Sequence, residues 1–215
     1  PHDLELSGRD AETIAQARLV LYLGGDFQPA LEDAVEATDA TALDLLRGSE
    51  DDPHVWLDPT RYADLARRIG EALGDGKQSR KLVDELSALD AEFEEGLADC
   101  ARREIVTSHA AFGHLAKRYD LEQVAITGIS PEAEPTPGEL RSVVAEVRES
   151  GATTIFFETL VSPRLAETVA REIGAETAVL NPLEGLTEEQ AAAGEDYFSI
   201  MRANLAALRE ALGCR

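Results

Sequence analysis

Short runs of apolar and β-branched residues alternate with longer amphipathic segments in the second half of the chain, and this alternation constrains the fold more than any other feature. We expect strands at residues 104–108, 123–127, 153–157 and 176–180. We expect helices at residues 110–119, 138–150 and 196–212, and a further helix opened by Pro163. Strands separated by helices of this length pair in parallel through right-handed crossovers. The second half is therefore predicted to form a parallel sheet flanked by helices.

The first half shows a shorter version of the same pattern. Ser7 is placed to cap a helix that runs to about Ala17. The elements expected after it are a strand at residues 19–23, a helix at 29–37, a short strand near Ala42 and a helix at 59–73. This half is predicted to form a second, smaller α/β unit.

One long helix is predicted between the two halves. Its apolar positions, at spacings of four, three, four and four residues, are Leu82, Leu86, Leu89, Phe93 and Leu97. A helix over residues 78–100 would be about 33 Å long. This length, and the break at residues 74–76 before it, favour a rigid strut over an ordinary crossover helix.

We therefore expect an α/β protein of two lobes, each with a parallel sheet flanked by helices, joined by one long rigid helix. The N-terminal lobe would comprise residues 1–76, the linking helix residues 77–101 and the C-terminal lobe residues 102–215.

Three of the four histidines stand in separate, turn-rich contexts. His2 and His54 each follow a proline, and His109 follows the strand expected at residues 104–108. Imidazole nitrogens brought together from distant loops are typical of a transition-metal site, and their wide separation excludes a zinc finger or ribbon. For each residue alone, the alternative is a hydrogen-bonded histidine in a surface loop. His114 lies on a different helix face from His109, and we assign it no role.

The ends of the strands indicate where such a site would lie, because open α/β sheets bind ligands at the carboxyl ends of their strands. His109 and Glu184 both follow strands of the second half, so they should face one crevice. His2 and His54 would approach it from the other lobe. Three imidazoles and one carboxylate form a four-coordinate site that suits Zn(II) and is acceptable to Mn(II).

The fourth position of this site has competitors. Glu158 and Asn181 also stand at strand ends and could take the place of the carboxylate. Trp56, the only tryptophan, is expected to pack in the core or the cleft wall, and Asp58 is expected to cap the helix that follows it.

Charge and hydropathy narrow the classes of function. The net charge of -22 argues against a nucleic-acid partner, because the phosphate backbone would be repelled. No run approaches the roughly 18 apolar residues of a membrane-spanning helix.

The two cysteines, Cys100 and Cys214, lie far from each other and from the histidines in sequence, which excludes a cysteine-rich metal site. A disulfide between them would close a loop of about 114 residues and would imply an oxidising compartment. Two unpaired cysteines are the alternative.

Six segments resemble the signatures of the zinc/manganese ABC-transporter solute-binding proteins, and they occur in the same order as in that family. They are residues 1–6 (PHDLEL), 52–59 (DPHVWLDP), 107–113 (TSHAAFG), 155–160 (IFFETL), 180–187 (LNPLEGLT) and 197–205 (YFSIMRANL). Together they cover essentially the whole chain, and the block around His54 is highly specific.

The resemblance implies two α/β lobes bridged by one long helix, with the metal held in the cleft between them. It implies that His2, His54 and His109 bind the metal through ring nitrogens. Family members fill the fourth position with a carboxylate or with water, and Glu184 falls within one residue of the carboxylate position. Three histidines look like the zinc-preferring branch, so the implied cargo is Zn(II), with Mn(II) acceptable.

The same resemblance implies a monomeric, extracytoplasmic receptor, either periplasmic or lipid-anchored at the cell surface. Such a receptor captures zinc and hands it to the membrane permease of an ABC transporter, and it is not an enzyme. The resemblance also favours the disulfide between Cys100 and Cys214.

The chain departs from the family pattern in two places. Family members usually carry about one more strand–helix–strand before the Pro-His motif, so the first lobe is expected to be incomplete as given. His2 would then lie at a chain end that frays, which would weaken the site or leave it three-coordinate. Zinc-specific relatives often have a His- and Asp-rich loop before the second ligand, whereas residues 47–52 (RGSEDD) stand here.

Two other functions use the same residues. In a zinc hydrolase, the three histidines would hold an activated water, with Glu158 or Glu184 as the general base. The chain lacks the short His-Glu-x-x-His motif of many such enzymes. In an adhesion module of the same fold, the metal would serve structure only.

Overall fold

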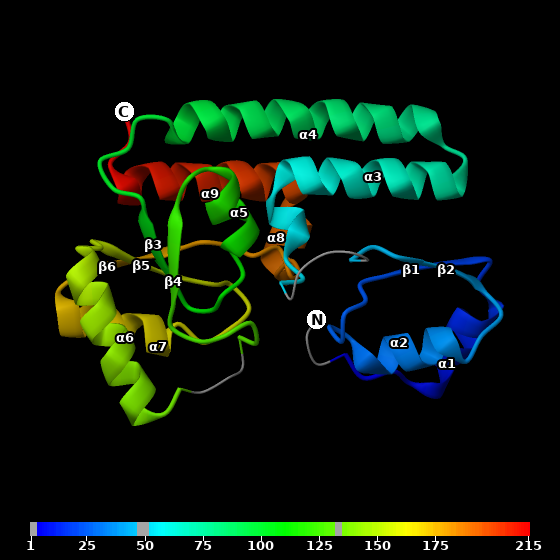
Figure 1. Cartoon of the computed structure of the whole chain (residues 1–215), viewed down its shortest axis with the longest axis horizontal. Coiled ribbons are helices and arrows are strands. Elements are labelled where there is room, and N and C mark those ends of the chain that lie inside the picture. The colour runs from blue at the N-terminus through cyan, green and yellow to red at the C-terminus, as the bar shows by residue number, and fades with distance from the viewer. Residues whose placement is uncertain (1–3, 47–51, 132–134) are drawn as a thin grey trace.

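Two parallel β-sheets, each flanked by helices, form the computed structural model of the protein, which describes residues 4–46, 52–131 and 135–215. Figure 1 shows the two sheets side by side beneath one long helix that lies across the top of the molecule. The predicted class, an α/β fold with parallel sheets flanked by helices, is confirmed. Within the described residues, no helix is both long and apolar enough to span a membrane.

The N-terminal lobe is built on a pair of short parallel strands, with Leu19 opposite Thr41. Its elements are α1 (Gly8–Gln16), β1 (Leu19–Tyr22), α2 (Pro29–Glu36) and β2 (Thr41–Asp44). The predicted cap at Ser7 is confirmed, because its hydroxyl accepts the Asp10 N–H while the Asp10 carboxylate accepts the Ser7 N–H. Both helices lie on the side of the strands that faces away from the long helix (Figure 1).

The C-terminal lobe contains a four-stranded parallel sheet with the strand order β4-β3-β5-β6. Its strands are β3 (Glu104–Thr107), β4 (Glu122–Ala125), β5 (Thr154–Phe157) and β6 (Glu176–Val179). Its helices include α5 (Gly113–Arg118), α6 (Pro137–Ser150) and α7 (Arg164–Ile173). All four strands lie within a few residues of their predicted positions.

Alternate residues of the central strands β3 and β5 face opposite sides of this sheet, as the two-residue period of a strand requires. Ile105 and Phe156 are buried on one side against α5, α4 (Gly76–Leu97) and α9 (Tyr197–Leu212). Val106 and Ile155 are buried against α6 and α7 on the other side. Because both faces of the sheet are covered by helices, the carboxyl ends of its strands are where the sheet can present functional side chains.

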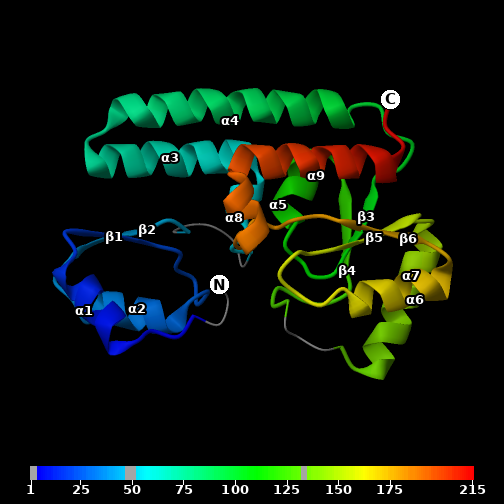
Figure 2. The same ribbon diagram turned by 180° about the vertical axis from the view of Figure 1, so that it is seen from behind.

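Three helices form a layer that joins the lobes: α3 (Pro59–Leu73), α4 (Gly76–Leu97) and α9 (Tyr197–Leu212). In both views α4 runs along α3 and α9, and contacts between α4 and each of the other two support this arrangement (Figures 1 and 2). The long helix was predicted at residues 78–100 and begins two residues earlier, where Asp75 caps it by accepting the Gln78 N–H. The domain limits at residues 76 and 101 stay a prediction.

A disulfide joins Cys100 to Cys214, 114 residues apart, and ties the segment after α4 to the segment after α9. Next to it, the Arg102 N–H donates to the Leu212 carbonyl oxygen and the Arg215 N–H donates to the Asp99 carbonyl oxygen. The disulfide that the family resemblance favoured is therefore present.

Two local features differ from the prediction. Helix α5 begins at Gly113 rather than Ala110, because the Ala110 N–H donates to the carbonyl oxygen of Gly128 in the next loop. Helix α8 (Glu188–Ala193) was not predicted. It is too short to show an apolar period, although the capping box of Thr187 and Gln190 could have indicated its start.

Candidate metal centre

Two histidines and one glutamate from distant parts of the chain meet in the interior of the protein. His54 directly precedes the short 3-10 helix η1 (Val55–Leu57), which leads into α3. His109 follows β3, and Glu184 stands in the loop after β6, so both extend from carboxyl ends of strands in the larger sheet. Both imidazoles are fully buried, and the Glu184 side chain is 5% exposed.

The three side chains converge on one carboxylate oxygen. The Nε2 atoms of His54 and His109 each lie 3.1 Å from Oε1 of Glu184. The candidate ligand atoms of the three residues all lie within 4.8 Å of one another. This spacing suits a single small ion.

A second carboxylate orients the ring of His54. Asp52 Oδ1 lies 2.7 Å from Nδ1 of His54 and also accepts the backbone N–H of His54 at 3.0 Å. The buried His114 donates from Nε2 to the Asp52 carbonyl oxygen at 2.9 Å. His114 therefore supports the segment that carries His54, a role that its sequence position did not indicate.

A third carboxylate orients the ring of His109 in the same way. Oε1 of the buried Glu158 accepts hydrogen bonds from Nδ1 of His109 and, at 2.6 Å, from the Ser108 hydroxyl. Each imidazole thus uses Nδ1 toward an orienting carboxylate and Nε2 toward Glu184. An imidazole whose Nδ1–H is held by a carboxylate is the usual form of a metal-binding histidine.

The carboxylates also change the protonation of the rings in the metal-free protein. Burial disfavours the imidazolium form of His109, but the hydrogen bonds to Glu158 and Glu184 outweigh it and raise the pKa of His109 to about 9. The same balance, with Asp52 in place of Glu158, raises the pKa of His54. The buried carboxyl of Asp52 has a lowered pKa because the His54 hydrogen bonds outweigh its desolvation. With a pKa of about 9, the ring of His109 is protonated at neutral pH when no metal ion is bound, and it donates hydrogen bonds to both Glu158 and Glu184.

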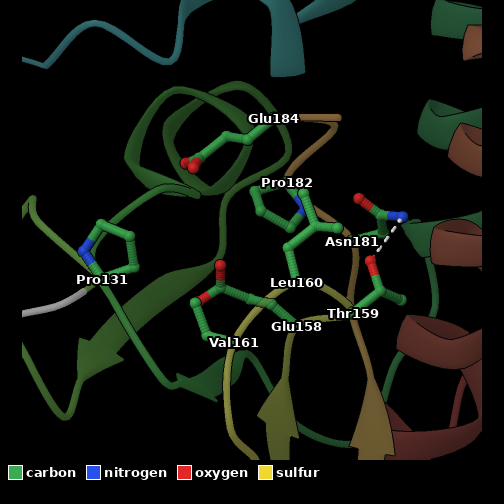
Figure 3. A pocket seen from close by; sticks show the side chains of 8 residues that line it. All are labelled: Pro131, Glu158, Thr159, Leu160, Val161, Asn181, Pro182 and Glu184. Atoms are coloured by element: carbon green, nitrogen blue, oxygen red, sulfur yellow. Dashed lines mark hydrogen bonds between the residues drawn. The ribbon is translucent and has the colours of Figure 1, made fainter. Parts of the chain in front are cut away.

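A pocket of about 220 Å³ opens beside Glu158 and Glu184. In Figure 3 both carboxylates extend to the side of the pocket away from Asn181 and Thr159. Leu160, Val161, Pro131 and Pro182 form its apolar walls. The pocket thus borders two of the carboxylates that surround the histidines.

Of the four predicted site residues, the structure brings together His54, His109 and Glu184. His2 lies outside the described residues, as do residues 47–51 of the segment that stands in place of a His-rich loop. The two competitors for the fourth position have other partners. Glu158 accepts a hydrogen bond from Nδ1 of His109, the ring nitrogen that faces away from Glu184. The side-chain oxygen of Asn181 accepts the Leu183 N–H.

The sequence alone did not identify Asp52 and Glu158 as the residues that orient the histidines. Asp52 precedes His54 by two residues, which is a signal that local reasoning could have used. Glu158 follows β5 and is 49 residues from His109, so only the pairing of β3 with β5 brings the two side chains together.

The family model described as zinc-uptake complex component A, periplasmic (ZnuA) matches residues 1–211. The chain belongs to the ZnuA family. Among relatives, the zinc-binding lipoprotein AdcA of Streptococcus pneumoniae is 35% identical over 98% of this chain and 49% of its own length. The high-affinity zinc uptake system protein ZnuA of Bacillus subtilis is 33% identical over 99% of this chain and 77% of its own length. The chain spans about half the length of the AdcA relatives it matches.

Solved structures of ZnuA-like proteins have the same fold as this chain. The Zn(II)-bound ZnuA-like domain of Streptococcus pneumoniae AdcA is 36% identical, with a TM-score of 0.78 over 99% of this chain and 86% of that chain. The laminin-binding protein Lmb of Streptococcus agalactiae, described as bifunctional with adhesin and metal transporting activity, is 29% identical. Its TM-score is 0.86 over 98% of this chain and 86% of that chain.

Proposed function

We propose that this protein is an extracytoplasmic receptor that captures Zn(II) and delivers it to the membrane permease of an ABC transporter. In this proposal His54, His109 and Glu184 are ligands, and His2 completes the site. The observation that carries it is the convergence of two buried imidazole Nε2 atoms on one carboxylate oxygen, each at 3.1 Å.

The geometry fits zinc chemistry. Zinc binds imidazole nitrogen and carboxylate oxygen at about 2.0–2.2 Å, so neighbouring ligand atoms around a tetrahedral ion lie about 3.3 Å apart. The two nitrogen–oxygen distances here are close to that value. Because Asp52 and Glu158 hold the Nδ1 atoms, loss of the Nε2 protons would leave both lone pairs directed at one point.

The ZnuA family supports the biological part of the proposal. The relatives that resemble this chain are named as zinc-binding lipoproteins or zinc uptake proteins, which work outside the cytoplasm. The transported ligand would be Zn(II), with Mn(II) a weaker competitor, because nitrogen-rich sites suit zinc better than manganese. We propose that the protein acts as a monomer, does not bind nucleic acid and performs no covalent chemistry.

The site argues for a receptor rather than a hydrolase. A catalytic zinc keeps one position open for an activated water. In the proposed site Glu184 takes one coordination position and the three histidines take the others, so no position stays open for an activated water. The adhesin function is described for Lmb, and no contact among the residues that the structure describes argues for it in this chain.

Calorimetric titration of the metal-stripped protein with Zn(II) tests the proposal. We expect one tight site in the unmodified protein, loss of tight binding in His54→Ala, and clearly weaker binding in Glu184→Ala. Glu210→Ala, which removes an exposed glutamate from α9, is the matched control and should bind like the unmodified protein. The absence of a tight site in the unmodified protein would refute the metal assignment. Tight binding unaffected by Glu184→Ala would remove Glu184 from the ligand set.

A further inference from the structure

We propose that helix α9 positions Glu184 as a metal ligand, through Asn204 and Tyr197 and with Trp56 as the link to the His54 segment. This inference rests on the proposed zinc site. It assigns a positioning role to three residues that are not proposed as metal ligands. Tyr197 and Asn204 are seven residues apart, so they lie about two turns apart on one face of α9. One helix face therefore meets both ligand-carrying segments.

Asn204 holds the start of the Glu184 loop. Its side chain is buried, accepts the Asn181 N–H at 2.8 Å and donates to the Asn181 carbonyl oxygen at 2.7 Å. This pair of bonds replaces the strand neighbour that the backbone of Asn181 would otherwise need. The position of Asn181 relative to α9 is thus set from both sides of the residue.

Asn181 then shapes the turn that presents Glu184. Its side-chain oxygen accepts the Leu183 N–H at 2.8 Å. Leu183 adopts a φ of 59°, a left-handed conformation that is unfavourable for any residue with a side chain as large as leucine. Such a conformation persists only where surrounding contacts hold it, and the bonds of Asn181 and Asn204 supply those contacts. The turn directs the next side chain, Glu184, toward the imidazoles.

Trp56 and Tyr197 link this loop to the His54 segment. The indole N–H of Trp56 donates to the Pro182 carbonyl oxygen at 2.8 Å. The Tyr197 hydroxyl donates to the Trp56 carbonyl oxygen at 2.7 Å, and the Tyr197 ring packs against Tyr62 of α3. His54 and Glu184 are therefore held at a set separation by contacts that do not involve either side chain.

The fixed separation of His54 and Glu184 should affect which metal ion the site prefers. Zn(II) accepts a tight four-coordinate site, whereas Mn(II) prefers more oxygen ligands in a larger, roughly octahedral arrangement. A carboxylate that cannot move away favours the smaller coordination number. Loosening the Glu184 loop should therefore reduce zinc affinity and reduce the preference for zinc over manganese.

The test is a double-mutant cycle between Glu184→Ala and each of Asn204→Leu, Trp56→Phe and Tyr197→Phe. Zn(II) affinity is measured by competition with a chromophoric chelator, and Co(II) is used as a spectroscopic probe because its visible bands are strong when four-coordinate and weak when six-coordinate. Tyr119→Phe is the matched control, since it also removes one buried phenol hydrogen bond, to Asp90, away from the site.

We expect Asn204→Leu to weaken zinc binding about 10-fold or more, within the range for residues that orient metal ligands, and to weaken the Co(II) bands. Trp56→Phe and Tyr197→Phe should act in the same direction but less strongly. In each of these backgrounds Glu184→Ala should cost much less than it does alone, because the carboxylate is already displaced. Tyr119→Phe should leave affinity, spectrum and the Glu184→Ala effect unchanged.

Additive effects of Glu184→Ala and the α9 variants would overturn the inference, as would an equal loss of affinity in Tyr119→Phe. Tyr197→Phe removes only the hydroxyl and preserves the ring packing against Tyr62, so it decides between these outcomes even if Asn204→Leu does not fold. A failure of the unmodified protein to bind zinc would instead refute the proposed function.

Discussion

Asp52 Oδ1 lies 2.7 Å from Nδ1 of His54 and accepts the backbone N–H of the same residue. One carboxylate oxygen thus sets both the ring and the main chain of His54. The equivalent partner of His109 is Glu158, which comes from a different strand. The two imidazoles are therefore oriented by independent carboxylates, and each can be tested separately.

Replacing Asp52 should weaken zinc binding without removing a ligand. We expect Asp52→Ala to raise the zinc dissociation constant about 10- to 100-fold, because the His54 ring loses the partner that holds its tautomer and direction. Asp52→Asn should cost less, since the amide oxygen still accepts from Nδ1. Calorimetric titration of the metal-stripped variants measures both. Equal affinities for the unmodified protein and Asp52→Ala would show that the ring is held by other contacts.

Zinc binding should release protons and weaken at low pH. The pKa of His109 is about 9 in the metal-free protein, so this ring is protonated at neutral pH and must lose its Nε2 proton to bind a metal. We expect zinc affinity to fall about tenfold per pH unit below pH 9 for each proton displaced. Titrations at pH 7.5 in buffers of different ionisation enthalpy should give about one proton or more per zinc ion. A binding enthalpy independent of the buffer would contradict this.

The same raised pKa predicts the pH dependence of stability for the metal-free protein. A group whose pKa is higher in the folded state contributes stability that is fully present below its unfolded pKa of about 6.5 and is lost as the pH rises through about 9. The melting temperature of the stripped protein should therefore fall between pH 6.5 and pH 9. Glu158→Gln should flatten this dependence, because it removes a main cause of the raised pKa. A melting temperature that rises over this range would contradict the prediction.

The disulfide should matter for stability and not for metal binding. Cys214 follows the C-terminal end of α9 and is bonded to Cys100, whereas Tyr197 begins the same helix, so reduction or a paired Cys→Ser change should leave the metal centre intact. Chain entropy predicts a loss of about 4–5 kcal/mol in the free energy of unfolding for a closed loop of this size. Urea denaturation measures that loss, and zinc titration should give the same affinity within about twofold. A large fall in affinity would mean that the bridge sets the position of α9.

The close packing of α3 against α4 depends on the absence of a side chain at Gly70. A methyl group there would lie 2.3 Å from Cβ of Ser79, whose hydroxyl donates to the Ala66 carbonyl oxygen. We expect Gly70→Ala to destabilise the protein by about 1–3 kcal/mol, because two helix backbones must separate. Gly138→Ala is the matched control, since a methyl group there has its nearest neighbour at 3.8 Å. Urea denaturation should show a loss only for Gly70→Ala.

The amino-acid sequence by itself determined the elements of this protein and their order. The positions of strands and helices depend on the period of the apolar residues. The start of a helix depends on side chains within about three residues of its first turn. Ser7 and Asp58 were therefore predicted as caps, and both accept the expected backbone N–H groups. The parallel arrangement followed from the alternation of elements, because crossover helices leave few other ways to pair the strands. Helix α8 was missed, because six residues carry too little pattern.

The tertiary structure decided which atoms meet. His54 and Glu184 are 130 residues apart, and no local pattern specifies that their side chains approach to 3.1 Å. Glu158 illustrates the same point, since the sequence offered it as a competing ligand and the strand pairing places it behind His109 instead. Periodicity and capping are short-range effects that each segment carries in its own residues. The geometry of a site built from distant loops depends on how the sheet and helices pack, and it therefore exists only in the folded chain.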